Sequence, residues 1–321
     1  DLRRFVHSHN LYKGKQNWRD RTIFASFYRP NFAGGKERGK AMKQDTQEFY
    51  QETANRIMDF VHTHLHESLL TEQIAEELNL SQRQLSRIVY SVFGEPLSTY
   101  ILRERLEKAV LYMQIQAQTL TELSEKVGYD NPQSFSKAFK KHFGIAPKTY
   151  LARLEEHLQV FRNEGNALSF PAEVVDFEGL DLAYIRIADR YGASEAYRTG
   201  WKKLLQYLSD SRKPNETTRF IGLSFDDPNV TAAEHCRFYA CASVSSLLPP
   251  RGAIGRLFLP AGRYAVYTLQ GSYTDLQAAY NEITANIPYP IRFAMPFEEY
   301  IDYSEKNPES GSTKIYIPIK L

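Results

Sequence analysis

The sequence predicts a multidomain protein in which an all-α domain with two helix–turn–helix units precedes an α+β domain of duplicated strand–helix–strand–strand units. Two internal repeats and the chain length lead to this fold class. An apolar pattern with helical spacing recurs after fifty residues in the first half of the chain. A tyrosine-rich pattern of short strands and amphipathic helices recurs in the second half. The 321 residues suffice for two or three domains that each bury a core.

The expected domain boundaries follow these changes of pattern. They are an N-terminal extension at 1–49, the helical domain at 50–162, a linker at 163–169 and the α+β domain at 170–321. The linker begins where the helical periodicity is broken by Asn163-Glu164-Gly165-Asn166. The first helix of the helical domain is expected from Thr53 to about Leu65.

The distribution of apolar residues favours a protein that neither spans a membrane nor is secreted. No apolar run reaches the ~18 residues that a bilayer span needs, and residues 1–30 lack the apolar stretch of a secretory signal. We therefore expect a cytoplasmic protein that does not contact a membrane. The only cysteines, Cys236 and Cys241, are five residues apart in one predicted strand. Their side chains then point to opposite faces, so we expect two reduced thiols in or near a core.

The first repeat consists of three pairs of segments that share one offset of fifty residues without an insertion. The pairs are Leu70–Glu72 with Leu120–Glu122, Leu85–Val89 with Phe135–Phe139, and Phe93-Gly94 with Phe143-Gly144. Agreement of this kind indicates two copies of one structural unit.

Each copy has the signals of a short helix, a tight turn and a second helix. In the first copy Thr71 is expected to cap a helix that ends in a turn at Asn79-Leu80. Ser81 and Gln84 form a predicted capping box at the start of the second helix, and Gly94 ends it. The corresponding signals of the second copy are Asn131, Pro132 and Gly144.

The polar face of the second helix in each copy predicts contact with double-stranded DNA. Helix–turn–helix pairs also occur in proteins that never bind DNA, and segment 51–157 has twelve Lys and Arg against fourteen Asp and Glu. The positions of the charged residues, rather than their number, therefore decide whether this segment can bind DNA. The outward residues, none of them acidic, are Gln82, Arg83, Ser86, Arg87, Gln133, Ser134, Lys137, Lys140 and Lys141. Such a face suits a polyanion, and Arg and Gln can bond two atoms of one base edge.

A longer signature of this segment resembles the AraC/XylS DNA-binding domain. It comprises Ser81–Arg87, Phe93-Gly94, Gly128-Tyr129, Phe135–Lys137, Phe139–Gly144 and Pro147–Tyr150. The resemblance implies a transcription regulator with seven helices, one of them a long helix near residues 96–114 that joins the two units, and RNA polymerase as a further partner. The positions that match the base-reading residues of the family are Arg83, Ser86, Arg87, Gln133, Ser134 and Lys137. Two departures, Tyr90-Ser91 and Leu151, replace residues that are commonly basic in the family and imply a weaker grip on the DNA backbone.

The start of the chain is expected to be disordered or non-native upstream of Met42. Segment 1–50 has eleven Lys and Arg against five Asp and Glu, and it shows periodicity only in a short run at Thr22–Tyr28. Met42 precedes a polar stretch that leads into the first helix, so we expect translation to begin there. The alternative is that residues 1–41 form a basic arm that adds nonspecific affinity for DNA.

The second repeat predicts the architecture of the α+β domain. Ala183–Ile187 is echoed by Ala265–Leu269, and each of these strands is followed by an amphipathic helix. Further on, Arg237–Ala242 matches Lys314–Ile319. These pairs predict two strand–helix–strand–strand units that leave a cleft between them.

The domain at 170–321 resembles the GyrI-like effector-binding domains, and its combination with the preceding domain resembles the Rob-like regulators. The resemblance rests on Ile221-Gly222, Pro260–Val266, Phe297–Tyr300 and Ile315–Lys320. It implies a small-molecule effector pocket faced by Glu298. A lipophilic cation would suit a buried carboxylate among aromatic rings. The expected ligand-binding residues are Glu298, Tyr300, Tyr191, Tyr267 and Trp201. The alternative is that Glu298 is solvated at a strand edge and the tyrosines are core.

Other types of site find little support. His62 and His66 share a helical face, with His64 between them, but no third ligand stands near, so we expect no metal site and no cofactor. Glu298 and Glu299 alternate across a predicted strand rather than converge, which argues against acid–base catalysis and an enzyme. The alternative for the C-terminal domain is a small-molecule hydrolase or a protein-interaction module.

Overall fold

The computed structural model describes residues 44–320 apart from short gaps. The gaps are 116–118, 164–170, 193, 212–216, 229–230, 232, 234–235, 245–249, 273–274, 293 and 302–310. Met42, the expected extension up to residue 43 and most of the expected linker at 163–169 lie outside the described residues. Among the residues that are described, no helix combines the length and apolarity that crossing a lipid bilayer demands.

Seven helices form the first part of the described chain. They are α1 (Gln44–Thr63), α2 (Thr71–Glu77), α3 (Gln82–Phe93), α4 (Leu97–Ile115), α5 (Leu120–Lys126), α6 (Pro132–Phe143) and α7 (Pro147–Asn163). The first helix begins at Gln44 rather than at the expected Thr53. Residues 44–49, which were expected in the extension, are therefore helical. With Phe49 as their single apolar residue they carry no apolar periodicity, but Asp45 in the first turn stabilises a helix N-terminus.

The capping signals of the second helix in each unit are confirmed. The Ser81 hydroxyl accepts a hydrogen bond from the backbone N–H of Gln84 at 3.2 Å, and the Gln84 side chain accepts one from the N–H of Ser81 at 3.0 Å. Asn131 accepts a hydrogen bond from the N–H of Ser134 at 2.8 Å, directly before Pro132. Both helices end at a glycine in the left-handed region, as predicted.

The prediction that Thr71 caps α2 is wrong. The residue before the first helical turn is Leu70, which has no side-chain capping group, and Thr71 is the first helical residue. The helix α5 of the second unit does have a side-chain cap, because Thr119 accepts a hydrogen bond from the N–H of Glu122 at 3.2 Å. The two Leu-Thr-Glu triplets are identical, but their positions relative to the start of the helix differ by one residue.

The shift shows that the two units differ in length by one residue. Helix α5 begins 49 residues after α2, at Leu120 against Thr71, whereas α6 begins 50 residues after α3, at Pro132 against Gln82. The extra residue lies in the turn of the second unit. The expectation of one offset without insertion therefore holds for the second helix of each unit and not for the first.

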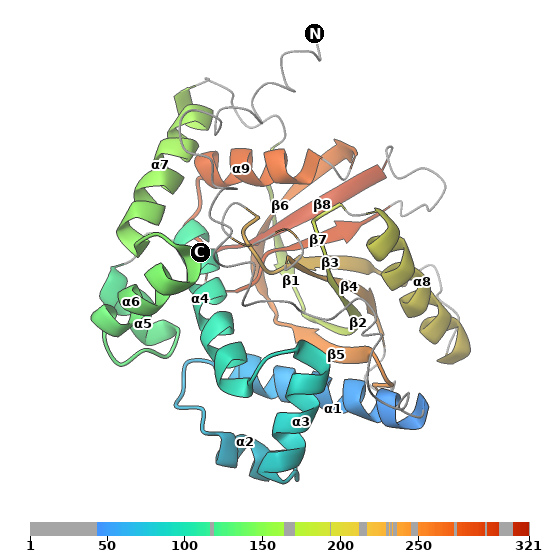
Figure 1. The fold of residues 1–321 in the computed structure, drawn as a ribbon. Helices are drawn as coiled ribbons and strands as arrows, with labels where there is room; N and C mark the ends of the chain where they lie inside the picture. The colour runs from blue at the N-terminus through green and yellow to red at the C-terminus, as the bar shows by residue number, and fades with distance from the viewer. Residues whose placement is uncertain are drawn as a thin grey trace.

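The described residues from 171 onward form one eight-stranded antiparallel sheet with two helices. Its elements are β1 (Glu173–Phe177), β2 (Leu180–Ala188), α8 (Ser194–Ser211), β3 (Phe220–Ser224), β4 (Arg237–Ser243), β5 (Ile254–Leu259), β6 (Gly262–Gly271), α9 (Leu276–Asn286), β7 (Phe297–Tyr300) and β8 (Gly311–Pro318). The strand order is β1-β6-β8-β7-β3-β4-β2-β5. Figure 1 shows the sheet at the centre, with α8 beside it and α9 above it.

Short connections force this sheet to curl. Only Glu178 and Gly179 separate β1, at one edge, from β2, which lies next to the other edge. Pro260 and Ala261 likewise join β5, at the second edge, to β6 near the first. The two ends of the sheet must approach each other, and β1 passes directly into β2 where they do so.

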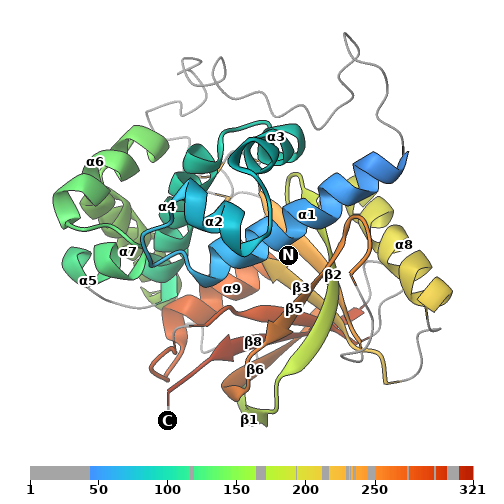
Figure 2. The same cartoon turned by 90° about the horizontal axis from the view of Figure 1, so that it is seen from below.

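The two faces of the sheet are covered by different helices. Alternation along β2 places Ile185 against α8, in a core with Trp201. The opposite face of the sheet carries Tyr184, which belongs to a core shared with Ile57 of α1 and Ile88 of α3. Figure 2 shows α1 lying across this second face. The first helix–turn–helix unit and the sheet therefore share one hydrophobic core.

The second helix–turn–helix unit has a core of its own. This core contains Phe135 and Phe139 of α6, with Leu123 of α5 and Tyr150 of α7. Helix α7 then runs beside α9 (Figure 1), where the Arg162 Nε donates a hydrogen bond to the carbonyl of Ala285 at 3.0 Å. The sheet domain thus contacts the helical part at both of its units.

Candidate nucleic-acid interface and ligand site

Helix α3 presents a polar face to solvent and an apolar face to the core. Leu85, Ile88 and Val89 are buried, whereas the outward side chains are exposed. The exposed candidates are Gln82, Arg83, Ser86 and Arg87. The guanidinium of Arg87 lies 5.7 Å from the centre of the Tyr50 ring of α1, a cation–π distance that restrains this side chain near the surface.

Helix α6 has the corresponding arrangement, with more charge. Phe135 and Phe139 are fully buried and form an edge-on pair at 5.6 Å. The exposed candidates are Gln133, Ser134, Lys137, Lys140 and Lys141. Neither α3 nor α6 contains an Asp or Glu, so each exposed face can approach phosphates without repulsion. At the end of α3 the exposed residue is Tyr90 rather than a cation.

Helix α4 connects the two units and is anchored at the end of α1. The Arg105 guanidinium donates hydrogen bonds to the carbonyls of Leu65 at 3.1 Å and of Glu67 at 2.6 Å. Leu106 and Val110 of α4 pack in the core of the second unit. The position of α4 therefore determines how α3 and α6 are placed relative to each other.

Glu298 lies in the packed layer between the sheet and its two helices. It is 1% exposed, because β7 is a central strand between β8 and β3, so the alternative of a solvated strand edge is wrong. Its Oε1 accepts a hydrogen bond from the hydroxyl of Tyr280 on α9 at 2.7 Å. In the described part of the chain, its Oε2 has no hydrogen-bond partner of ordinary geometry. Burial raises the pKa of Glu298 to about 7, although Tyr280 and Ser224 act to lower it.

The aromatic candidates divide into two groups. Trp201 and Tyr300 lie on the same face as Glu298 and form an edge-on pair at 5.9 Å. Tyr191 contacts the same core under α8. Tyr267 lies apart, on β6, which is separated from β7 by β8, and it packs under α9. Tyr267 and Glu298 are both paired with Ile315 of β8, so the structure places all five predicted residues on one side of the sheet, with Tyr267 two strands away from Glu298.

Two further residues shape the surroundings of Glu298. Tyr280, the hydrogen-bond donor, lies on the amphipathic helix that was predicted after the strand at Ala265–Leu269. Gly222 of β3 lies opposite Glu298, and a side chain there would place its Cβ 2.6 Å from Oε2 of Glu298 and against the hydroxyl of Tyr300. Only glycine leaves room for both groups. Gly222 belongs to a segment that carries the resemblance, but its place beside Glu298 and the hydrogen bond of Tyr280 could not be predicted locally, because both contacts join distant elements.

Glu299 lies on the opposite face and is paired. Its two carboxylate oxygens accept hydrogen bonds from Nε and Nη2 of Arg219 at 2.6 and 2.7 Å, and one also accepts from the hydroxyl of Tyr316 at 2.7 Å. Burial favours the neutral form, but these contacts outweigh it and lower the pKa of Glu299. The two neighbouring carboxylates diverge, as the strand alternation predicts.

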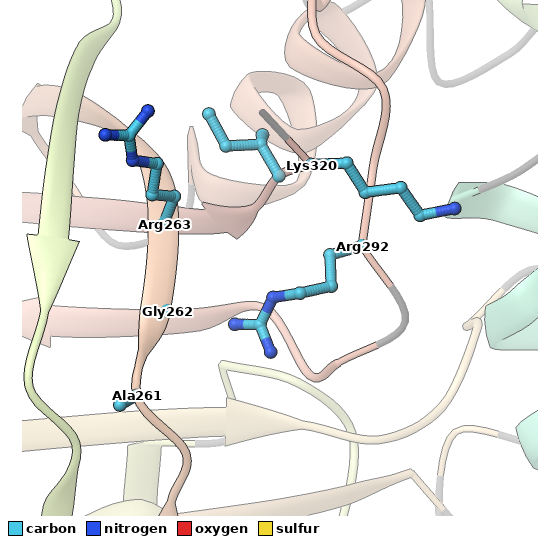
Figure 3. Close-up of a pocket in the computed structure, with 6 residues that line it drawn as sticks. Ala261, Gly262, Arg263, Arg292 and Lys320 are labelled. Atoms are coloured by element: carbon cyan, nitrogen blue, oxygen red, sulfur yellow. The ribbon is translucent and has the colours of Figure 1, made fainter.

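An open cavity of about 330 Å³ lies away from Glu298. It is lined by Ala261, Gly262, Arg263, Arg292, Ile319 and Lys320. Figure 3 shows that the cationic groups of Arg263, Arg292 and Lys320 point in different directions rather than toward one centre. The Arg292 guanidinium lies 5.3 Å from the centre of the Tyr264 ring. This cavity does not contain the predicted ligand-binding residues.

The three histidines near the end of α1 have separate surroundings. His62 Nε2 lies 2.9 Å from Oε2 of Glu104, and His64 Nδ1 lies 2.9 Å from the carbonyl oxygen of Phe60. His66 is exposed beside Glu67 at 3.5 Å. No group of three or more potential metal ligands occurs among the residues that the structure describes.

Comparisons with known proteins agree with this two-part arrangement. Residues 171–320 match the GyrI-like small molecule binding domain, and residues 74–153 match a helix-turn-helix domain. The right origin-binding protein of Escherichia coli K12 is 27% identical over 235 residues, which are 69% of this chain and 79% of that protein. The transcriptional regulator Rob of Salmonella typhimurium LT2 is 21% identical over 240 residues, with coverage of 69% and 79%.

Other relatives share only the helical part. The putative HTH-type transcriptional regulator YkgA of Escherichia coli K12 is 27% identical over 103 residues. The match covers 32% of this chain and 43% of YkgA, so the chain spans less than half of that relative. Together, the matches show that this chain combines an AraC-type helix–turn–helix domain with a C-terminal GyrI-like domain, and that its relatives are Rob and other AraC-family transcription regulators.

Proposed function

We propose that the protein is a sequence-specific transcription regulator that binds double-stranded DNA and whose C-terminal domain binds a small-molecule effector. The observation that carries this proposal is the pair of exposed, acid-free faces on α3 and α6, the two corresponding helices of the repeat. Two such helices can read successive major-groove segments if they lie about one duplex turn, ~34 Å, apart. The site of action is the cytoplasm, and RNA polymerase is a further partner.

A selection experiment tests the DNA-binding part. The full chain is used to enrich binding sites from a random duplex library, and the dissociation constants for the enriched site and for scrambled duplex are then measured at several salt concentrations. We expect the enriched site to bind at least about 10³-fold more tightly than scrambled duplex. Equal affinity for both would contradict sequence-specific reading.

We propose a lipophilic cation as the class of effector. The support is that Glu298 is buried among aromatic side chains, and that no cationic group within the described residues pairs with it. A cationic ligand would supply the missing counter-charge, and the rings of Trp201 and Tyr300 would contact its apolar part. Since Glu298 is buried, the side chains around it must move to admit a ligand.

A thermal-shift screen tests the effector class. Each lipophilic cation is paired with a neutral compound of the same shape, and the melting temperature of the full chain is recorded with and without the compound. We expect the cation of a pair to raise the melting temperature and its neutral counterpart to do so much less. Equal effects of both compounds would contradict a role for the carboxylate.

One observation favours the alternative of a hydrolase. A carboxyl group whose pKa is about 7, as for Glu298, can act as a general acid or base at neutral pH. Incubation of the protein with the compounds that raise its melting temperature, followed by mass spectrometry, separates the two functions. A sensor leaves the compound unchanged, whereas a hydrolase converts many molecules for each protein chain.

We also propose that the sheet domain consists of two copies of one strand–helix–strand–strand unit. The support is the strand order, in which β2, β4 and β3 follow one another in one half and β6, β8 and β7 in the other. In both halves the helix follows the first strand, and the halves meet where β3 pairs with β7. Glu298 lies at this junction, between the two helices.

A further inference from the structure

A buried ion cluster joins β4 of the sheet to α4, the helix between the two helix–turn–helix units. The Nη1 of Arg237 contacts Glu104, and its Nη2 lies 2.7 Å from Oε2 of Glu107 and 2.7 Å from Oδ1 of Asp226. Glu104 and Glu107 belong to α4, whereas Asp226 lies two residues after the end of β3. The side chains of Arg237, Glu107 and Asp226 are 12%, 2% and 0% exposed.

A second guanidinium completes the cluster from within the helical domain. The Nη1 of Arg103 donates hydrogen bonds to Glu107 at 2.9 Å and to Glu104 at 3.2 Å, and its Nη2 donates to Glu95 at 2.8 Å. Burial raises the pKa of Glu107 well above its usual range, although Arg103 and Arg237 act to lower it. Removal of one partner from such a site leaves a buried charge without compensation, so the cluster strongly favours one arrangement.

Tyr191 connects this cluster to the aromatic layer around Glu298. Its hydroxyl accepts a hydrogen bond from the N–H of Asp226 at 2.9 Å, and it lies 3.1 Å from the carbonyl oxygens of Asp226 and Arg237. The ring of Tyr191 packs against the core under α8. A movement of this ring therefore acts on the backbone of Asp226 and of Arg237, the residue that contacts α4.

A second contact ties the same loop to α7. The hydroxyl of Tyr150 donates a hydrogen bond to Oδ2 of Asp227 at 2.6 Å in a buried position. Asp227 thus contacts α7 directly, and Asp226 is linked to α4 through Arg237. These two helices precede and follow the second helix–turn–helix unit.

We propose that a coupling cluster fixes the position of α4 and thereby the placement of the two reading helices, α3 and α6. The cluster consists of Arg103, Glu104, Glu107, Asp226 and Arg237. Tyr191 transmits changes in the aromatic layer to this cluster. The proposal rests on the proposed function. Since α3 and α6 must reach successive groove segments, a displaced α4 changes both the affinity and the spacing at which DNA is bound.

The double variant Arg237→Gln with Glu107→Gln tests the coupling without any effector. It removes one cation and one carboxylate of the full chain, and binding is measured on the enriched site and on sites with one base pair inserted or removed between the two contacted segments. We expect about tenfold weaker binding to the enriched site and a smaller preference for its spacing. The matched control is Arg256→Gln, which removes a partly exposed pair with Asp181 at 3.1 Å and is expected to keep the affinity within about twofold.

The variant Tyr191→Phe tests whether Tyr191 links the aromatic layer to the coupling cluster. We expect about threefold weaker binding in the wild-type background and no further loss in the double variant, because both changes act through one element. Additive losses would overturn the route through Tyr191. A folded double variant that binds as wild type would overturn the coupling itself.

A third variant covers the case in which the double variant does not fold. Tyr150→Phe removes one hydroxyl of the second contact without changing the shape of the side chain, and we expect about threefold weaker binding. Unchanged affinity in this variant would overturn the coupling. If the wild-type chain enriches no site at all, the proposed function fails first and the coupling fails with it.

Discussion

The carboxylate of Glu298 and the hydroxyl of Tyr280 form a 2.7 Å hydrogen bond between the central strand β7 and helix α9. The bond satisfies one oxygen of a buried acid and leaves the negative charge of its ionised form without a cationic partner among the described residues. This relationship determines how the sheet domain responds to pH and to a cation.

The stability of the protein should decrease as the pH rises, because Glu298 then ionises in a buried position. Because the folded state raises the pKa of Glu298 from about 4.5 to about 7, the stabilising neutral form is fully populated below pH 4.5 and is lost as the pH rises through 7. Glu298→Gln should therefore melt close to the wild-type temperature at pH 5 and at a higher temperature at pH 8. The difference in the free energy of unfolding at pH 8 should be up to about 3 kcal/mol. Thermal unfolding at both values measures this difference.

The neighbouring acid provides the control. The pKa of Glu299 is lowered in the folded state, so its contribution is present at neutral pH and is lost as the pH falls. Glu299→Gln should consequently destabilise the protein at pH 8, in the opposite direction to Glu298→Gln. If both variants shift the melting temperature in the same direction at pH 8, the assignment of the two acids is incorrect.

Glu298→Gln should also abolish the effect of an effector. If a lipophilic cation pairs with this carboxylate, the neutral variant loses the counter-charge and the ligand no longer raises the melting temperature. The measurement is a thermal shift at pH 8 for wild type and variant with the same compound. A normal response of the variant would show that the ligand binds elsewhere.

DNA reading should be divided between the two exposed faces. Arg87→Ala and Lys137→Ala are each expected to weaken binding to the enriched site by ~1–3 kcal/mol and to relax the base preference locally. Lys140→Ala and Lys141→Ala should weaken binding to all sequences and reduce the salt dependence, since phosphate contacts carry no sequence information. Equal losses on specific and scrambled duplex for all four variants would contradict this division.

The caps of the first unit allow a matched stability test. Ser81→Ala removes the hydroxyl that accepts from the Gln84 N–H at 3.2 Å, and we expect a loss of about 1 kcal/mol in the free energy of unfolding. Thr71→Ala should cost much less, because Thr71 is the first helical residue and Ala favours helix. Chemical denaturation of both variants gives the comparison, and a larger loss for Thr71→Ala would contradict the position of the α2 cap.

The features that local interactions specify could be predicted from the sequence. The capping box of Ser81, the cap at Asn131 and the glycine ends of α3 and α6 depend on residues within four positions of one another, and the structure has all of them. The exposed faces of α3 and α6 follow from helical periodicity in the same way. The triplet at Thr71 was misleading because a short motif does not reveal a one-residue difference in the turn that follows its helix.

Only the tertiary structure decided how the candidate sites are built. The partner of Glu298 is 18 residues away, and the hydrogen bond from Arg237 to Glu104 spans 133 residues. The start of α1 at Gln44 likewise carries no apolar periodicity that could reveal it. Such contacts depend on which strands pair and on which face each helix covers, and a buried charge is stabilised by whatever group the packing brings to it rather than by its sequence neighbours.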